Sequence, residues 1–289
     1  MTEEHRALLK NQTWKMVPRS PTMNVISCKW LYRIKTKSDD SIDRYKARLV
    51  ARGFQQRPGL YFGDIFSPVL KPTTLRLIMS LVVSHKWPVR QLDIANAFLH
   101  GTLTDDVFMQ QPPGFVDPDR PDHVCHLQKS LYGLKQAPRA WFHCLRRALK
   151  AYGFHGSKTD TSLFILCRGS LRLHVLIYVD DILITGNQPY ALQALILYLN
   201  KKFAVRDLGR LSYFLGIETL WTPRELVLSQ RKYINHILAR AKMSSANVLS
   251  TPAATTTSNP DSMLFPDITL YRQIVGALQY LQFTRPDIA

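Results

Sequence analysis

One stretch decides the fold: Leu173-His174-Val175-Leu176-Ile177-Tyr178-Val179-Asp180-Asp181-Ile182-Leu183-Ile184. Two apolar arms flank a short polar tip, which predicts a β-hairpin over residues 171–185. Asp180 and Asp181 lie at the tip, where the arms limit their hydration. Adjacent carboxylates repel each other and are costly to desolvate, so a nearby cation would relieve the cost. We therefore predict a divalent metal ion there, and Mg²⁺ prefers such oxygen ligands.

A third carboxylate is expected beside this pair. Phosphoryl transfer needs carboxylates that hold two metal ions about 3.5–4 Å apart. Adjacent residues of a strand point to opposite faces, so Asp180 and Asp181 cannot both supply one face, and another strand must contribute a carboxylate. Asp93 is the candidate, because it lies near the end of the apolar strand predicted over Val89–Ile94. The competing interpretation is one surface aspartate and one strained turn. Two other Asp-Asp pairs, at 39–40 and 105–106, sit among polar residues and indicate solvated turns.

Composition limits the class of protein. The 289 residues are 46% apolar, enough for a substantial core. No run approaches the roughly 20 apolar residues of a membrane span, and residues 1–10 lack the apolar region of a signal peptide. The four cysteines lie far apart without metal-binding spacing, which suits reduced thiols in the cytoplasm or nucleus. We therefore expect a protein that is not secreted and has no membrane partner.

The charge balance favours a polyanionic partner. The net charge is +17, which destabilises a compact chain by self-repulsion unless a polyanion relieves it. Nine basic and three acidic residues occur between Cys28 and Arg57. Within this region, Cys28–Ile34 and Tyr45–Ala51 predict the two strands of a basic hairpin. The alternative is a soluble basic protein with a solvated, charged strand edge.

Other elements are predicted from apolar periodicity and turn residues. Helices are predicted at Thr73–His85 (capped by Thr73 or Thr74), Pro138–Tyr152, Tyr190–Phe203 and Leu270–Phe283. The remaining segments are a turn or helix start at Ala95–Leu99, a loop at Gln111–Pro121, and two short strands within Leu211–Leu228. Ser244–Ser262 has the Ser, Thr, Ala and Pro content of a linker.

An ordered series of motifs extends along nearly the whole chain. It comprises Cys28–Trp30, Arg44–Phe54, Phe66–Val69, Gln91–Gly101, Lys129–Pro138, Tyr178–Leu183, Asp207–Glu218 and Thr284–Ile288. With these motifs the sequence closely resembles the reverse transcriptase of copia-type long-terminal-repeat retrotransposons. A lone Tyr-x-Asp-Asp is weak support, but the complete ordered series is specific.

The resemblance implies an α+β chain with the right-hand polymerase fold. The fingers and the start of the palm would span residues 1–90, with part of the fingers inserted near 110–145. The palm, residues 91–243, would carry the catalytic hairpin and the primer grip on a split βαβ-like sheet with helices. Residues 244–289 would form a linker and a partial thumb.

The resemblance also implies the catalytic and metal-binding residues. Asp93, Asp180 and Asp181 would be the catalytic carboxylates and would bind two Mg²⁺ or Mn²⁺ ions. The backbone carbonyl of Ile94 would complete this metal shell.

Positively charged residues would bind the incoming nucleotide. Arg48 matches a fingers arginine that grips the triphosphate, and a guanidinium suits phosphate oxygens through paired hydrogen bonds. A lysine should assist it. Lys35, Lys37 and Lys46 compete for this role, and we favour Lys46.

The remaining implied contacts involve the sugar and the primer. Phe98 would be the steric gate beside the sugar 2′ position, with ordinary core packing as the alternative. Tyr132 and Gly133 would line the nucleotide pocket, although Tyr132 stands where retroviral relatives have glutamine. Tyr178 would support the primer end. The residues that resemble the primer grip are Phe214, Leu215 and Gly216.

The implied activity is RNA- and DNA-directed DNA synthesis onto a primer 3′-hydroxyl. Its partners would be an RNA template, a DNA primer, their RNA–DNA hybrid and deoxyribonucleoside triphosphates, in virus-like particles of the cytoplasm or in the nucleus. Integrase would precede this segment in a polyprotein and ribonuclease H would follow it, so we expect a fragment or a degenerate copy. Two alternatives stay open: a catalytically idle nucleic-acid-binding remnant, and a basic RNA-binding scaffold. The scaffold leaves the apolar setting of Asp180 and Asp181 unexplained.

Overall fold

The computed structural model describes residues 1–36, 41–57, 59, 68–222, 225–247 and 265–288. Helices and strands are mixed along the chain, which divides into two compact units. The first unit comprises Met1–Leu70 and Pro88–Gly209, and the second comprises Lys71–Trp87 and Arg210–Ala289. The second unit therefore combines a helix from the first third of the sequence with the C-terminal residues. Within the described ranges, no helix is both long and apolar enough to cross a membrane.

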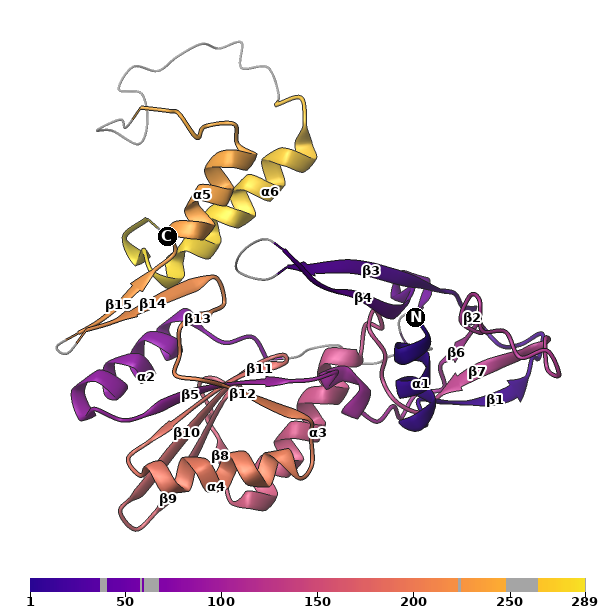
Figure 1. The fold of residues 1–289 in the computed structure, drawn as a ribbon, viewed down its shortest axis with the longest axis horizontal. Helices are drawn as coiled ribbons and strands as arrows, with labels where there is room; N and C mark the ends of the chain where they lie inside the picture. The colour runs from indigo at the N-terminus through magenta and orange to yellow at the C-terminus, as the bar shows by residue number, and fades with distance from the viewer. Residues whose placement is uncertain (37–40, 58, 60–67, 223–224, 248–264, 289) are drawn as a thin grey trace. The chain divides into compact units, whose positions relative to one another are not determined.

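The first unit is built on a six-stranded sheet with the strand order β12-β5-β11-β10-β9-β8 (Figure 1). Its strands are β5 (Val89–Ile94), β8 (His155–Gly156), β9 (Leu163–Arg168), β10 (Leu171–Tyr178), β11 (Asp181–Gly186) and β12 (Val205–Gly209). All neighbouring strands pair antiparallel. Strand β11 is buried from Ile182 to Gly186, which explains its continuous apolar run. The predicted hairpin and the strand ending near Asp93 are both confirmed.

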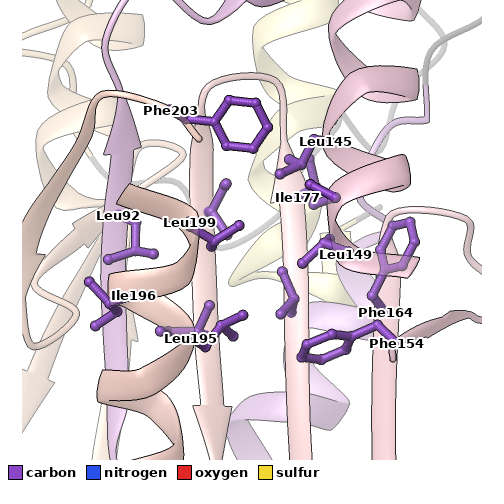
Figure 2. Packing of buried hydrophobic residues seen from close by; sticks show 14 of the residues in the cluster. Leu92, Leu145, Leu149, Phe154, Phe164, Ile177, Leu195, Ile196, Leu199 and Phe203 are labelled. Atoms are coloured by element: carbon purple, nitrogen blue, oxygen red, sulfur yellow. The ribbon is translucent and has the colours of Figure 1, made fainter. Parts of the chain in front are cut away.

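Two helices, α3 (Ala137–Tyr152) and α4 (Pro189–Asn200), share one buried core with this sheet. Alternate residues of β10 enter the core, as the two-residue period of a strand requires. Figure 2 shows Leu145 and Leu149 of α3 and Leu195 and Leu199 of α4 in the same apolar layer as the strands. The prediction for α3 is confirmed within one residue. Helix α4 ends before the predicted Phe203.

A smaller sheet, a hairpin and a helix complete the first unit. The sheet has the order β1-β7-β6-β2, with β1 (Trp14–Pro18), β2 (Val25–Ile26), β6 (Phe108–Met109) and β7 (His123–Leu127). The predicted basic hairpin is confirmed as β3 (Cys28–Thr36) paired with β4 (Ile42–Ala51), and residues 37–40 of its turn lie outside the described residues. Helix α1 (Thr2–Lys10) and the 3₁₀ turns η1 (Gly53–Gln55) and η2 (Ala97–His100) are also present.

The second unit contains helices and a three-stranded sheet, β13-β14-β15. Its elements are α2 (Pro72–His85), β13 (Tyr213–Phe214), β14 (Ile217–Trp221), β15 (Leu226–Ser229), α5 (Arg231–Arg240), α6 (Ile268–Gln279), η3 (Tyr280–Phe283) and η4 (Pro286–Ile288). Most of the predicted linker Ser244–Ser262 lies outside the described residues, which omit 248–264.

Two predictions for the second unit were wrong in detail. Helix α2 starts at Pro72 rather than after a threonine cap, because proline suits the first helical position, where no N–H partner is needed. Leu211–Leu228 contains three strands instead of two, since the two-residue strand β13 is too short to show a period of its own. The final predicted helix is α6, which continues as the 3₁₀ turn η3.

Candidate active site

Asp180 and Asp181 lie where β10 and β11 meet. Tyr178 pairs with Asp181, so Val179 and Asp180 form a two-residue tip. The φ angle of Val179 is 56°, a left-handed conformation that is a clear outlier for a β-branched residue. Such strained residues persist only where the surrounding structure holds them, and they cluster at functional sites.

Two hydrogen bonds hold this tip. The indole N–H of Trp141 on α3 donates to the carbonyl of Val179 over 2.6 Å. The backbone N–H of Ile94 on β5 donates to the carbonyl of Asp180 over 3.0 Å. Both donor residues have buried side chains, only 1% exposed, so they form rigid anchors. Since an isoleucine side chain has no donor atom, only the backbone carbonyl of Ile94 could bind a metal ion.

Asp93 lies directly opposite Asp181 in the sheet. The antiparallel register of β5 and β11 pairs these two residues, and Asp180 immediately precedes Asp181. All three side chains are half-buried. The fold therefore brings together the three carboxylates that the sequence singled out, although residue 93 is far from residue 180 along the chain.

Burial and mutual repulsion shift the proton affinity of this cluster. Loss of solvent, reinforced by the charges of Asp180 and Asp93, raises the pKa of Asp181 to about 6. Burial also raises the pKa of Asp180; Asp93 acts in the same direction, while Arg48 and Lys46 oppose the shift. A cation bound nearby would favour the ionised carboxylates and so oppose these rises in pKa.

The donor set fits a hard divalent cation. Carboxylate oxygens and the backbone carbonyl of Ile94 are ligands that Mg²⁺ and Mn²⁺ prefer. In the part of the chain that the structure describes, no three His, Cys, Asp or Glu side chains already converge as a metal-binding group. The three carboxylates are therefore neighbours rather than a finished cage. Closer convergence costs repulsion energy that a bound cation would offset.

Three side chains form a continuous row next to the carboxylates. The guanidinium of Arg48 on β4 lies 4.7 Å from the centre of the Tyr132 ring. The rings of Tyr132 and Phe98 meet edge to face with centroids 4.9 Å apart. Phe98 is half-buried and packs against both cores of the first unit. The row joins the predicted triphosphate-binding arginine to the predicted sugar gate, and cation–π contact orients the guanidinium.

Tyr132 also belongs to the electrostatic surroundings of the carboxylates. Burial raises the pKa of its phenol, an effect that Arg48 opposes and Asp180 reinforces. The next residue, Gly133, has a φ angle of 89°, and a Cβ atom there would lie 2.1 Å from the carbonyl oxygen of Ala51. Only glycine allows these two backbone segments to approach so closely, and this approach positions Tyr132 beside β4.

Lys46 lies two residues before Arg48, so the two side chains share one side of β4. Burial raises the pKa of Asp180, and both positive charges oppose this rise, so they are within electrostatic range of that carboxylate. Lys35 pairs with Arg44 through the backbone, and Lys37 lies outside the described residues. The choice of Lys46 among the three lysines stays a prediction.

The residues that resemble a primer grip lie in the second unit. The Phe214 ring is 2% exposed and forms part of the core. Leu215 and Gly216, with φ angles of 52° and 73°, make the tight turn between β13 and β14. The hydroxyl of Tyr280 donates to the carbonyl of Leu215 over 3.0 Å. The Phe214 ring is therefore covered, whereas Leu215 and Gly216 are half-buried.

Sequence reasoning missed two residues that shape the site. Trp141 lies in the helix predicted over Pro138–Tyr152, and nothing in the apolar periodicity indicated that its N–H reaches the hairpin tip. Gln91 is only 6% exposed, and its side chain hydrogen-bonds to Asp181, which opposes the rise in pKa. The available signal for Gln91 was its place two residues before Asp93 in the predicted strand, which puts the two side chains on one face.

Comparison with known proteins agrees with the family that the motifs indicated. A family model described as "Reverse transcriptase (RNA-dependent DNA polymerase)" matches residues 11–255. The retrovirus-related Pol polyprotein from transposon RE1 of Arabidopsis thaliana is 52% identical over 295 residues, covering 100% of this chain and 20% of the relative. The corresponding polyprotein from transposon TNT 1-94 of Nicotiana tabacum is 39% identical over 304 residues, covering 100% and 23%. The chain thus spans about a fifth of these curated relatives.

A solved structure also aligns with the chain. It is described as "Structure of the foamy viral protease-reverse transcriptase dRH in complex with ds DNA". The alignment covers 95% of this chain and 38% of that chain, with 12% identity and a TM-score of 0.44. At that score the likeness is too loose to decide the fold, which rests on the strand order and register of this chain.

Proposed function

This chain belongs to the reverse transcriptase (RNA-dependent DNA polymerase) family of copia-type retrotransposon Pol polyproteins, and on that premise we propose that it copies RNA and DNA templates into DNA. One observation carries the proposal: Asp93 pairs with Asp181 beside Asp180, in a half-buried cluster within range of Arg48 and Lys46. Carboxylates next to phosphate-binding cations suit nucleotidyl transfer onto a primer 3′-hydroxyl.

We assign two Mg²⁺ or Mn²⁺ ions to Asp93, Asp180, Asp181 and the backbone carbonyl of Ile94. When bound, these ions would activate the primer 3′-hydroxyl and stabilise the leaving pyrophosphate. The protein's own contribution is to keep the carboxylates in position. The hydrogen bonds from Trp141 and Ile94 to the hairpin tip serve this purpose.

Arg48 and Lys46 are the proposed triphosphate ligands. Stacking on Tyr132 restricts the orientation of the Arg48 guanidinium, so less freedom is lost when phosphate oxygens bind. At the other end of the row, Phe98 would lie under the sugar and exclude a 2′-hydroxyl. Gly133 contributes by letting the backbone that carries Tyr132 approach β4.

We propose the right-hand polymerase fold for this architecture. The β10–β11 hairpin beside β5, with α3 and α4 in the shared core, would be the palm, and the β3–β4 hairpin would belong to the fingers. The proposed divisions are residues 1–90, 91–243 and 244–289, with the last containing the thumb helix α6. The compact units cut across these divisions, since Lys71–Trp87 groups with the C-terminal residues.

The proposed partners are an RNA template, a DNA primer, their hybrid and deoxyribonucleoside triphosphates. Tyr178, next to the tip, would support the primer end, and the turn at Leu215–Gly216 would contact the primer strand. The net charge of +17 supports a nucleic acid partner whose binding weakens with salt. We propose virus-like particles of the cytoplasm, or the nucleus, as the location of this activity.

Primer extension on poly(rA)/oligo(dT) by the purified chain, with Mg²⁺ or Mn²⁺, tests the proposed function. The expected result is metal-dependent extension that is lost in the Asp180→Asn variant. If the chain binds the primer–template but never extends it under either metal, the proposal fails, and the chain is an idle nucleic-acid-binding remnant.

A further inference from the structure

Two oppositely charged residues of the first unit each bury a polar atom without a hydrogen-bond partner. These atoms are Oε1 of Glu4, in the first turn of α1, and Nε of Arg48, on β4. Buried polar atoms are nearly always hydrogen-bonded, and leaving one unpaired costs stability, so each exception needs a physical explanation. Arg48 is also the proposed triphosphate ligand, which places the second orphaned atom at the nucleotide site.

Packing holds Glu4 near the nucleotide site. Leu8 of α1 and Leu49 of β4 belong to one buried cluster, which fixes the helix beside the strand (Figure 1). Glu4 precedes Leu8 by four residues, so both lie on the same face of α1. Glu3 is the natural comparison, because it is exposed although it lies in the same helical turn.

Glu4 shares its cations with a catalytic carboxylate. Burial raises the pKa of Glu4, and the positive charges of Lys46 and Arg48 both oppose this rise. The same two cations oppose the rise in the pKa of Asp180. Glu4 also acts on Tyr132, whose ring carries the Arg48 guanidinium. Glu4 is therefore electrically part of the nucleotide site, although it comes from a helix that precedes the family match at residues 11–255.

We propose that Glu4 is an internal counter-anion for Lys46 and Arg48. When a nucleotide binds, its triphosphate takes over this role from the Glu4 carboxylate. Without nucleotide, the carboxylate partly neutralises the two cations and limits their repulsion. Oε1 of Glu4 and Nε of Arg48 make no hydrogen bond to each other, so no such bond has to break when phosphate oxygens bind the guanidinium. A triphosphate carries more negative charge and more acceptor atoms than one carboxylate, so it interacts with the two cations more strongly than Glu4 does. This inference rests on the proposed function, in which Lys46 and Arg48 bind triphosphate.

Binding of sodium tripolyphosphate to the full chain, measured by calorimetry, tests the inference without requiring polymerisation. Glu4→Gln removes the internal anion and should tighten binding by roughly 3- to 10-fold, the effect of one partly screened charge. Glu3→Gln removes the same charge from the same helical turn and should bind like the wild type. Adding Arg48→Ala to Glu4→Gln should abolish the gain.

Steady-state kinetics give a second measurement. Glu4→Gln should lower the KM for deoxynucleotide by a similar factor and leave kcat unchanged, a split that general loss of packing would not produce. Glu4→Asp keeps the charge while shortening the side chain, so its affinity should stay close to that of the wild type; it also serves if Glu4→Gln folds poorly.

Three outcomes would overturn the inference: equal tripolyphosphate affinities in Glu4→Gln and Glu3→Gln, weaker binding in Glu4→Gln, or the same gain in Glu4→Asp. Weaker binding would mean that Glu4 only holds Arg48 in place. Tighter tripolyphosphate binding in a chain that never extends a primer would support the counter-anion while rejecting the proposed polymerase function.

Discussion

Asp93 on β5 lies directly across the antiparallel register from Asp181 on β11, at the end where the hairpin tip begins. The backbone N–H of Ile94, the next residue on β5, donates to the carbonyl of Asp180. The sheet itself therefore makes three carboxylates neighbours, and their mutual repulsion is a consequence of the fold. Bound protons or cations reduce this repulsion between the carboxylates, which links metal binding, pH and activity.

Asp180→Asn should abolish primer extension while largely sparing affinity for primer–template. We expect a loss of ~1,000-fold or more in kcat, because the carboxylate acts in the chemical step. Affinity should persist, since it comes from Lys and Arg contacts with phosphates and falls with salt. Asp105→Asn, at the first residue of another Asp-Asp pair, is the matched control and should retain extension. Near wild-type extension by Asp180→Asn would exclude this residue from the metal site.

The metal-free protein should lose stability as pH rises through about 6, the raised pKa of Asp181. The usual pKa of an aspartate is 3.8, so the folded state binds this proton more tightly than the unfolded state. The stability contributed by this proton is complete below the pKa of the unfolded state and is lost as pH rises through the pKa of the folded state. Melting temperatures measured in a chelator should therefore decrease as pH rises from 3.8 to about 6, the interval between the two pKa values, and level off above it.

Asp181→Asn should flatten this pH dependence, because the titrating group is removed. Added Mg²⁺ should raise the melting temperature of the wild type more above the pKa of Asp181 than below it, where protons compete with the metal. An unchanged pH profile in Asp181→Asn would place the titration on another group.

Arg48→Ala should raise the KM for deoxynucleotide far more than it weakens duplex binding. A charge-assisted phosphate contact contributes about 1.5–3 kcal/mol, so KM should increase roughly 10- to 150-fold. Arg44→Ala on the same strand is the control, because Arg44 is exposed and ion-pairs with Asp43. Equal damage to nucleotide and duplex binding in Arg48→Ala would place the residue on the template path instead.

Phe98→Ala should relax discrimination between deoxyribonucleotides and ribonucleotides. A rigid ring beside the 2′ carbon rejects an added hydroxyl more effectively than an ordinary apolar pocket does. If the clash contributes ~1.4–4 kcal/mol, the ratio of the kcat/KM values should shift by roughly 10- to 1,000-fold. Single-nucleotide extension with each nucleotide measures it.

Phe108→Ala is the matched control for Phe98→Ala. Phe108 is another half-buried phenylalanine with an aromatic neighbour, and it stacks on His126 at a centroid distance of 4.8 Å. Its removal should leave sugar discrimination unchanged. An active Phe98→Ala enzyme with the wild-type ratio would show that Phe98 is ordinary core.

Val179→Gly should separate stability from activity. Glycine removes the strain of a positive φ angle, about 1–2 kcal/mol, which offsets the about 0.4–1 kcal/mol of added chain entropy in the unfolded state. The melting temperature should therefore stay the same or rise slightly. In contrast, kcat should fall several-fold, because the glycine tip no longer confines Asp180 to one conformation.

Lys86→Gly is the control for the backbone effect. Lys86 also has a positive φ angle, 52°, but it caps helix α2 in the second unit. The substitution should relieve comparable strain and leave kcat unchanged. A full kcat in Val179→Gly would show that the strained tip plays no part in positioning the carboxylates.

Local patterns were sufficient for the strongest elements of the fold. The hairpin over residues 171–185 follows from two mainly apolar arms, and the strand Val89–Ile94 has apolar residues at Val89, Leu92 and Ile94, which are buried in the core. The strands β2 and β6 escaped prediction, because two residues cannot display a period. Helices α1 and α5 also escaped, since each buries only one residue and offers little apolar signal.

The sequence by itself determined the family and the identity of the three carboxylates, because the ordered motifs and the charges within apolar runs are visible in one dimension. Only the tertiary structure decided that Asp93 faces Asp181, that Trp141 anchors the hairpin tip, and that Glu4 lies near Arg48. These relationships join residues far apart along the chain. They depend on strand register and helix packing, which arise from the whole fold and leave no local pattern.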